Sequence, residues 1–353
     1  MALDIQKYRA LCKRALAGHG LRNAAALLAE IPAELGVDTY GEHGAVEALE
    51  REMRTVLGKP AVAFMPSGTM AQQIALRIHA DRRGRRTVAF HPTCHLEVRE
   101  DKAYQRLHGL VGVTLGEPHS LFGIEDLKRV AEPLAAVLFE LPQREIGGRL
   151  PEWADLQAQV AYVRSRGAAV HLDGARLWES TPFYERTPAE ISALFDTVYV
   201  SHYKGLGALA GCCLAGPEED IAEARAWRKR HGGTLYGMWP NAASALVNLR
   251  KRLPLMPRYL EHARRIAKAL QGVPNVQVVP DPPQTPMMLL HLRIDPEAFR
   301  QRAWRLAEEE GLATWPDATP GTLGTHVIEL GVGDATLAFT PEQVAGIVER
   351  LVN

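Results

Sequence analysis

The chain has 353 residues, of which 46% are hydrophobic and 23% charged, a composition typical of a folded globular protein rather than a disordered one. Its 41 basic and 41 acidic residues cancel, so no net field favours nucleic acid or an anionic membrane. The basic clusters at 81–86 and 225–231 are small and are interpreted as solvated surface. We therefore expect neither nucleic acid nor a membrane as a partner.

The N-terminus and the cysteines indicate the cellular compartment. The first 20 residues mix acids and bases with apolar residues and lack the apolar core of a secretory signal. No stretch approaches the roughly 20 apolar residues that cross a bilayer. The cysteines, at positions 12, 94, 212 and 213, fit neither a disulfide framework nor a zinc site. These features predict a cytoplasmic protein without a metal.

The predicted elements begin with residues 4–35, which have the period of one or two amphipathic helices and precede a turn-rich connector at 36–44. Residues 45–58 have helical period and end in glycine, as helices often do. The sequence AVAFMPSGTMAQQIALRIHA then passes from a short apolar strand through a Pro-Ser-Gly turn into a helix. This order predicts a strand, a turn and a helix.

Apolar runs and helical stretches alternate through the middle of the chain. The apolar runs are TVAFHP (87–92), AAVLFELP (135–142), AAVHLDG (168–174) and TVYVSHYKG (197–205). Helical stretches at 123–132 and 153–167 lie between them. Unbroken apolar strands that alternate with helices predict an α/β domain whose mostly parallel sheet is covered by helices.

The pattern changes near residue 240. A long helical region is followed by a strand-like run at 287–294 and a final helix at 341–352. We expect an N-terminal helical extension at 1–35, a large α/β domain at 36–244 and a smaller C-terminal α+β domain at 245–353.

Polar residues follow several predicted strands. In mostly parallel sheets ligands bind beyond the carboxyl ends of the strands. Ser67, His95, Asp173 and Lys204 are therefore expected to converge at that edge.

A lysine, an acid and a helix N-terminus at one sheet edge suit pyridoxal 5'-phosphate (PLP). Its aldehyde needs a lysine amine, its ring nitrogen needs a carboxylate partner, and its phosphate needs backbone donors. Lys204, Asp173 and the Gly68-Thr69 turn meet one demand each. Taken singly, each has an ordinary alternative: a solvent-facing strand end, a turn or helix cap, and a simple turn.

Four blocks resemble the threonine aldolase family, in the beta-eliminating lyase group of fold-type I PLP enzymes. They read GVDTYGEHGAVEALE, MPSGTMAQQIAL, VHLDGARLWES and SHYKGLGALAG. The resemblance covers residues 36 to about 235 well and the C-terminal part loosely. It implies a fold-type I architecture with a large sheet domain and a smaller C-terminal domain.

The resemblance also implies roles for individual residues. Lys204 matches the Schiff-base lysine, and Asp173 matches the partner of the pyridine nitrogen. His95 matches the histidine that stacks on the cofactor ring, and Arg176 matches an arginine that contacts the substrate carboxylate. Further cofactor-binding positions are assigned to the phosphate turn and the strand end: Ser67, Gly68, Thr69 and Ser201. Without the match, His95 would be interpreted as a loop histidine and Arg176 as helix surface.

Substrate-binding positions depart from the family pattern. Gln143 stands where the family has a second histidine, and glutamine cannot act as a base near neutral pH. Tyr236 stands where an arginine is expected, and Glu329 lies at the place of a second carboxylate-binding arginine. The family's N-terminal arm, which supplies a serine to the substrate carboxylate, has no counterpart in residues 1–35.

The resemblance implies an aldolase that cleaves a β-hydroxy-α-amino acid into glycine and an aldehyde, with His95 or a bound water as the base. Alternatives on the same scaffold are β-elimination, transaldol transfer and racemisation, because the altered carboxylate contacts set which bond at Cα breaks. A noncatalytic α/β binding module is the alternative from another class. The family also implies a homodimer or homotetramer, with an amino acid as the small-molecule partner.

Overall fold

The computed structural model describes residues 4–321 and 324–353. The chain forms two compact units. The larger unit comprises Ala24–Glu145 and Arg149–Pro254, and the smaller comprises Met1–Asn23, Ile146–Gly148 and Leu255–Asn353. The division of the chain into domains at 35 and 244 stays a prediction.

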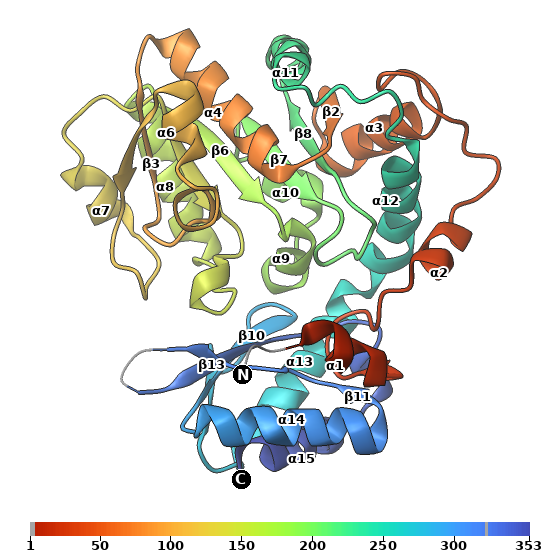
Figure 1. The fold of residues 1–353 in the computed structure, drawn as a ribbon. Coiled ribbons are helices and arrows are strands. Elements are labelled where there is room, and N and C mark those ends of the chain that lie inside the picture. Colours follow the sequence, from red (N-terminus) through yellow and green to blue (C-terminus); the bar gives the residue numbers. More distant parts are fainter. Residues whose placement is uncertain (1–3, 322–323) are drawn as a thin grey trace. The chain divides into compact units, whose positions relative to one another are not determined.

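A seven-stranded sheet forms the centre of the larger unit (Figure 1), with the strand order β2-β8-β7-β6-β5-β3-β4. The strands are β2 (Ala61–Met65), β3 (Thr87–Phe90), β4 (Val111–Thr114), β5 (Ala136–Glu140), β6 (Ala169–Gly174), β7 (Thr197–Ser201) and β8 (Cys212–Gly216). Five strands, from β7 through β4, run parallel, whereas β8 is antiparallel to both of its neighbours. The prediction of a mostly parallel α/β sheet is confirmed.

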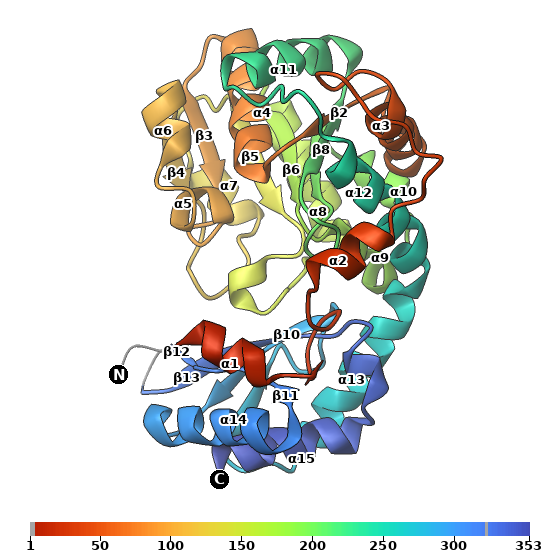
Figure 2. The ribbon, with the colours of Figure 1, turned by 45° about the vertical axis from the view of Figure 1, so that its right-hand side comes forward.

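The larger unit also contains helices, which pack on the sheet or on one another. They are α2 (Ala24–Ala29), α3 (Gly44–Leu57), α4 (Gly68–Arg83), α5 (His95–Val98), α6 (Ala103–His108), α7 (Ile124–Arg129), α8 (Trp153–Ser165), α9 (Leu177–Tyr184), α10 (Pro188–Ser192), α11 (Glu218–Arg230) and α12 (Trp239–Arg252). Helices α4 and α11 lie side by side over the sheet in both ribbon views (Figures 1 and 2) and contact each other and β2 and β8.

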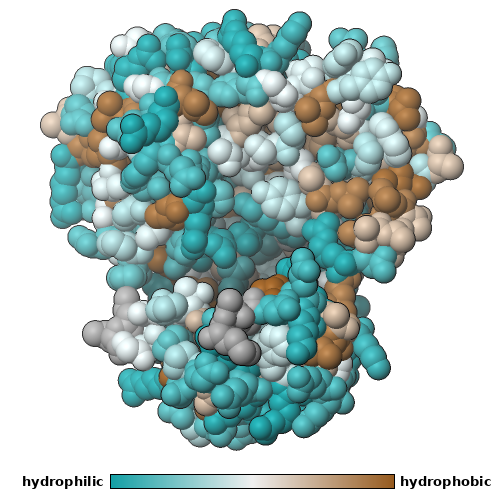
Figure 3. Space-filling view, in the orientation of Figure 1, coloured by the Kyte–Doolittle hydropathy of each residue, from teal (hydrophilic) through white to brown (hydrophobic). Residues whose placement is uncertain are grey.

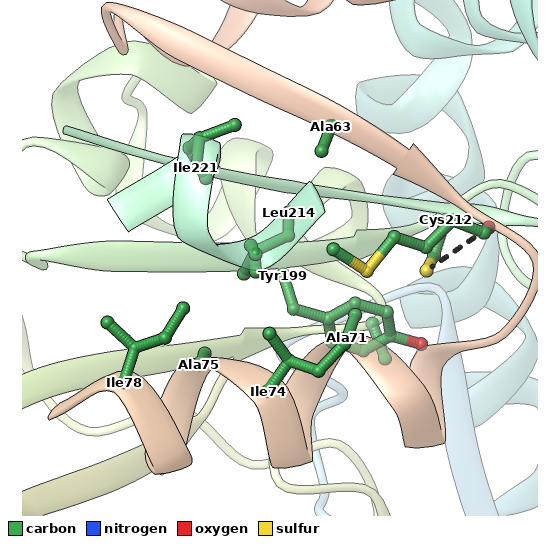
Figure 4. Close-up of a cluster of buried hydrophobic side chains, with 12 residues drawn as sticks. Ala63, Ala71, Ile74, Ala75, Ile78, Tyr199, Cys212, Leu214 and Ile221 are labelled. Atoms are coloured by element: carbon green, nitrogen blue, oxygen red, sulfur yellow. Dashed lines mark hydrogen bonds between the residues drawn. The ribbon is translucent and has the colours of Figure 1, made fainter. Parts of the chain in front are cut away.

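Helix α4 joins the helical layer to the sheet. Its buried apolar residues recur at i, i+3, i+4 and i+7, the spacing of one helix face: Ala71, Ile74, Ala75 and Ile78. Figure 4 shows these side chains directed at residues of β7, β8 and α11, including Tyr199, Leu214 and Ile221. Each buried isoleucine contributes roughly 2 kcal/mol by leaving water. This packing fixes the direction in which α4 begins.

The smaller unit contains a four-stranded antiparallel sheet with the order β12-β13-β10-β9, and a two-stranded parallel pair of β1 and β11. Its strands are β1 (Arg14–Ala15), β9 (Val276–Val279), β10 (Met287–Leu292), β11 (Leu312–Ala313), β12 (Thr319–Pro320) and β13 (His326–Gly331). Its helices are α1 (Ile5–Leu11), α13 (Met256–Leu270), α14 (Pro296–Glu310) and α15 (Pro341–Val352).

The N-terminal region contains two helices, in line with the prediction of one or two helices over 4–35, but they are short and a strand lies between them. Helix α1 ends at Leu11 and α2 begins at Ala24, while Arg14–Ala15 pairs with Leu312–Ala313 as β1. A strand that finds its partner about 300 positions away along the chain leaves no local signal in the sequence.

On the face shown in Figure 3, hydrophobic residues lie in groups among hydrophilic ones, and a larger group lies on the right-hand side. Within residues 4–321 and 324–353, no helix combines the length and the hydropathy needed to cross a membrane. In the same ranges, no cluster of three or more His, Cys, Asp or Glu side chains is arranged to hold a metal ion.

Candidate active site

The carboxyl ends of three neighbouring parallel strands place acidic and basic side chains together in the larger unit. Glu140 ends β5 and lies in register with Asp173 near the end of β6. Strand β7 ends at Ser201, and Lys204 follows three residues later. The structure therefore brings Asp173 and Lys204 to one edge, as predicted, and adds Glu140, which the sequence analysis did not select.

The Asp173 carboxylate is held by two donors. Its side chain is almost fully buried, with 1% of the residue exposed. Nε2 of Gln72 donates to Oδ2 at 2.5 Å, and the backbone N–H of Ala175 donates to Oδ1 at 3.0 Å. A carboxylate offers about four acceptor positions. Asp173 can therefore still accept a hydrogen bond from a ligand.

Lys204 lies in the loop after β7, mostly buried. Burial lowers the pKa of Lys204, because desolvation disfavours the ammonium form. Asp173 and Glu140 oppose this shift, whereas Arg176 and Arg144 add to it. A lowered pKa leaves more of the amine neutral, which is the form that attacks a carbonyl.

The N-terminus of α4 forms the third part of the site. Ser67 is the N-cap: its Oγ accepts a hydrogen bond from the N–H of Met70 at 3.2 Å. No described hydrogen bond between described residues uses the N–H of Gly68 or Thr69. A Cβ at Gly68 would overlap the hydroxyl of Tyr199. The helix thus begins with two free donors at a position where only glycine fits.

Ser201 lies beneath this edge. It is the last residue of β7 and is fully buried. Its carbonyl oxygen accepts a hydrogen bond from Nε1 of Trp178 at 3.1 Å, which fixes the chain where it turns towards Lys204.

His95 begins α5 and keeps 34% of its side chain exposed. Its Nδ1 lies 2.9 Å from Oε1 of Glu100, whose side chain is 1% exposed. Nε2 of Gln73 donates to the other oxygen of Glu100 at 3.5 Å. Because a carboxylate only accepts, this pair places the proton of a neutral His95 on Nδ1 and leaves Nε2 as an acceptor.

Glu140 is a partly buried acid that accepts hydrogen bonds from three donors. The N–H of His95 donates to it at 3.3 Å, the N–H of Arg144 at 3.2 Å, and Nε2 of Gln143 at 3.3 Å. Burial, with a smaller contribution from the neighbouring Asp173, raises the pKa of Glu140 to about 8. Glu140 therefore ties together the segments that carry His95, Gln143 and Asp173.

The predicted substrate-binding residues occupy different surroundings. Gln143 is buried, and its Nε2 also donates to Oγ1 of Thr93 at 3.4 Å. Arg176 is the N-cap residue of α9, with 15% of its side chain exposed and its Nε 3.7 Å from Oε1 of Glu179. Tyr236 is 72% exposed, and its ring meets that of Tyr40 edge-on at 5.5 Å between centroids.

Glu329 lies in the smaller unit, in the middle of β13. It pairs with Leu289 of β10, and its carbonyl oxygen accepts a hydrogen bond from Nε1 of Trp315 at 2.8 Å. Its role at the place of a family arginine stays a prediction.

The donor set fits PLP. Lys204 offers a buried amine with a lowered pKa, Asp173 offers an anchored acceptor, and α4 offers two free N–H groups at the positive end of its dipole. The glycine demanded at position 68 lets the backbone approach a phosphate closely. Each chemical demand of the cofactor is therefore met by a different element of the larger unit.

Comparisons with known proteins agree with this chemistry. The pattern of the family described as beta-eliminating lyase matches residues 23–295. A solved structure from Listeria monocytogenes EGD-E, described as a putative L-allo-threonine aldolase, superposes with a TM-score of 0.91 at 38% identity, covering 99% of this chain and 98% of its own. A putative aromatic amino acid beta-eliminating lyase/threonine aldolase from Exiguobacterium sp. 255-15 has a TM-score of 0.91 at 37% identity, with 98% of each chain covered. Low-specificity L-threonine aldolase 1 of Arabidopsis thaliana is 26% identical over 79% of this chain and 81% of its own.

Proposed function

The chain belongs to the beta-eliminating lyase family, a family of PLP-dependent enzymes, and from that premise we propose that it cleaves a β-hydroxy-α-amino acid into glycine and an aldehyde. A threonine-like amino acid is the substrate class. The proposal rests on the position of Lys204, Asp173 and the N-terminus of α4, which lie together at one edge of the sheet. The chain also matches a putative L-allo-threonine aldolase along nearly its whole length.

The cofactor would be held at three points. Lys204 would attach it covalently, Asp173 would accept a hydrogen bond from its ring nitrogen, and the N–H groups of Gly68 and Thr69, with the Ser67 hydroxyl, would bind its phosphate. Ser201 supports the loop that carries Lys204. When bound, PLP supplies the electron sink that lets the bond between Cα and Cβ break.

His95 is the residue best placed to move a proton. Glu100 accepts a hydrogen bond from Nδ1–H of His95, which leaves Nε2 without a hydrogen. Nε2 can therefore accept the proton of the substrate β-hydroxyl as the bond between Cα and Cβ breaks. Glu100 also stabilises the imidazolium that forms. The buried Gln143 can hold a hydroxyl group but cannot take its proton near neutral pH. The base function therefore rests with His95, directly or through a bound water.

Arg176 would bind the substrate carboxylate. Its guanidinium emerges at the start of α9, three residues after Asp173, and Glu179 steadies it from one side. A planar guanidinium binds a carboxylate with two parallel hydrogen bonds. Tyr236 would take part in substrate recognition, in place of the family arginine, from the surface that it shares with Tyr40.

We also propose a homodimer or homotetramer in the cytoplasm.

The test is a product assay with purified enzyme, PLP and a panel of β-hydroxy-α-amino acids. Cleavage predicts equal amounts of glycine and aldehyde. His95→Asn is expected to lower kcat by roughly 10²-fold or more while the protein still binds PLP. Ammonia and a keto acid would indicate β-elimination, and an inverted amino acid would indicate racemisation. Turnover that releases no aldehyde contradicts the proposal.

A further inference from the structure

A continuous chain of buried polar side chains leads away from Asp173 into the interior of the larger unit. Gln72 and His79 lie seven residues apart on α4, hence on one helix face, while His171 and Thr197 are neighbours in register on β6 and β7. All four residues are at most 2% exposed. Water therefore cannot replace a partner that is lost.

The contacts join these residues in one line. Nε2 of Gln72 donates to Oδ2 of Asp173 at 2.5 Å, and Oε1 of Gln72 lies 3.2 Å from Nε2 of His171. Nδ1 of His171 lies 2.8 Å from Oγ1 of Thr197, which lies 2.7 Å from Nε2 of His79. Each member contacts the next through one atom pair.

The chemistry of these atoms sets a single direction. Asp173 accepts, so the amide nitrogen of Gln72 faces it and the amide oxygen faces His171. An amide oxygen also only accepts, so Nε2 of His171 carries a hydrogen. Burial lowers the pKa of His171 to about 3, and the ring is neutral; its Nδ1 therefore has no hydrogen and accepts from Thr197.

The far end follows by the same rule. The single hydroxyl proton of Thr197 is given to His171, so His79 must donate to Thr197 through Nε2. Burial likewise lowers the pKa of His79 to about 3, which leaves one hydrogen on its ring. Every donor in the line consequently points towards Asp173, and bonds aligned in this way strengthen one another.

We propose that Gln72, His171, Thr197 and His79 are positioning residues: their one-way hydrogen-bond chain fixes the Asp173 carboxylate as an acceptor and so keeps the PLP ring nitrogen protonated. This inference rests on the proposed function, which makes Asp173 the partner of that nitrogen. Without this hydrogen-bond chain, Oδ2 of Asp173 loses the hydrogen bond donated by the Gln72 side chain. With PLP bound, the proton shared between Asp173 and the ring nitrogen would then lie closer to the carboxylate.

The test uses PLP labelled with ¹⁵N in the ring, bound to the holoenzyme, with the ¹⁵N chemical shift as the readout. Wild type is expected to show a protonated ring nitrogen. Gln72→Met removes the donor to Asp173, and the resonance is expected to move towards the unprotonated position. The dissociation constant for PLP is expected to rise about tenfold, because a hydrogen bond to a charged group is lost.

Two further variants keep the test independent of a folding defect at Gln72. Thr197→Val breaks the hydrogen-bond chain at its third member from Asp173, with Gln72 and His171 between them, and is expected to shift the resonance in the same direction by less. Thr197→Ser restores the hydroxyl and is expected to restore the wild-type resonance. The matched control is Gln73→Met, a neighbour on α4 that is equally buried but bonds to Glu100, and it is expected to leave the resonance unchanged.

The outcomes separate this inference from the proposed function. If the wild-type protein binds no PLP, both the inference and the proposed function are overturned. The same holds if the Asp173→Asn variant keeps a protonated ring nitrogen. If Asp173→Asn moves the resonance while Gln72→Met and Thr197→Val leave it in place, the proposed function stands and the positioning role of the chain is wrong. A shift in Gln73→Met as large as that in Gln72→Met also overturns the positioning role.

Discussion

Acidification is expected to weaken the protein through its buried histidines, and His171 allows the effect to be isolated. Desolvation by burial, with a smaller contribution from His79, lowers the pKa of His171 from 6.5 to about 3. The unfolded chain binds a proton below pH 6.5, whereas the folded protein does so only near pH 3. The stability contributed by neutral His171 is therefore complete above pH 6.5 and is lost as the pH falls towards 3.

The magnitude follows from proton linkage. At pH 5 the unfolded state holds almost one proton more at this site than the folded state does. With 1.36 kcal/mol per pKa unit, the free energy of unfolding falls by about 2 kcal/mol between pH 8 and pH 5 from His171 alone. His171→Asn lacks this titration. The wild type is expected to lose about 2 kcal/mol more than the variant over that interval.

Urea unfolding of the apo-protein at pH 8 and pH 5, followed by tryptophan fluorescence at one protein concentration, measures this difference. The slope of the transition must be alike in both proteins, so that only stability is compared. Equal losses in wild type and His171→Asn would show that His171 is charged in the folded state. The direction assigned to the Asp173 hydrogen-bond chain would then be wrong as well.

Three other substitutions test the site. Gly68→Ala should cost about 1–3 kcal/mol in thermal unfolding and weaken PLP binding, because its Cβ meets Tyr199, whereas Gly346→Ala, with open space around its Cβ, should be neutral or stabilising. Glu140→Gln should become more stable relative to wild type as the pH rises from 5 to 8, because the raised pKa of Glu140 penalises the folded carboxylate. A stability difference that does not change with pH would contradict this. Ser67→Ala should lower the free energy of unfolding by about 1 kcal/mol through loss of the N-cap. Chemical denaturation measures this, and an unchanged free energy of unfolding would contradict the capping role.

The sheet and part of the site could be predicted from local patterns. Unbroken apolar runs marked β5, β6 and β7, and the charged residues that follow two of them, Asp173 and Lys204, lie at one edge because parallel strands share an end. The strand-turn-helix pattern located the start of α4 within a residue. Local sequence is sufficient where the strand ends alone determine which residues meet.

Other parts depended on tertiary contacts. Glu140 ends an apolar run just as Asp173 does, so the same argument could have selected it. His171 lies two residues before Asp173, and the period of two in a strand places both on one face. Their link through Gln72 depends on the rotation of α4 over the sheet, and the contact of Glu100 with His95 depends on the turn after α5. No period in the sequence encodes either contact.

The central claim is that Lys204, Asp173 and the start of α4 form a PLP site, and the most direct measurement locates the covalent attachment. Wild-type holoenzyme is reduced with borohydride, digested and analysed by mass spectrometry. Lys59 serves as the internal control, because burial also lowers the pKa of this lysine but its ammonium donates to the carbonyl of Phe195. The account predicts a phosphopyridoxyl group on Lys204 and none on Lys59, and no stable adduct in Lys204→Ala. Label on another lysine, or an unlabelled Lys204 in fully loaded enzyme, would contradict it.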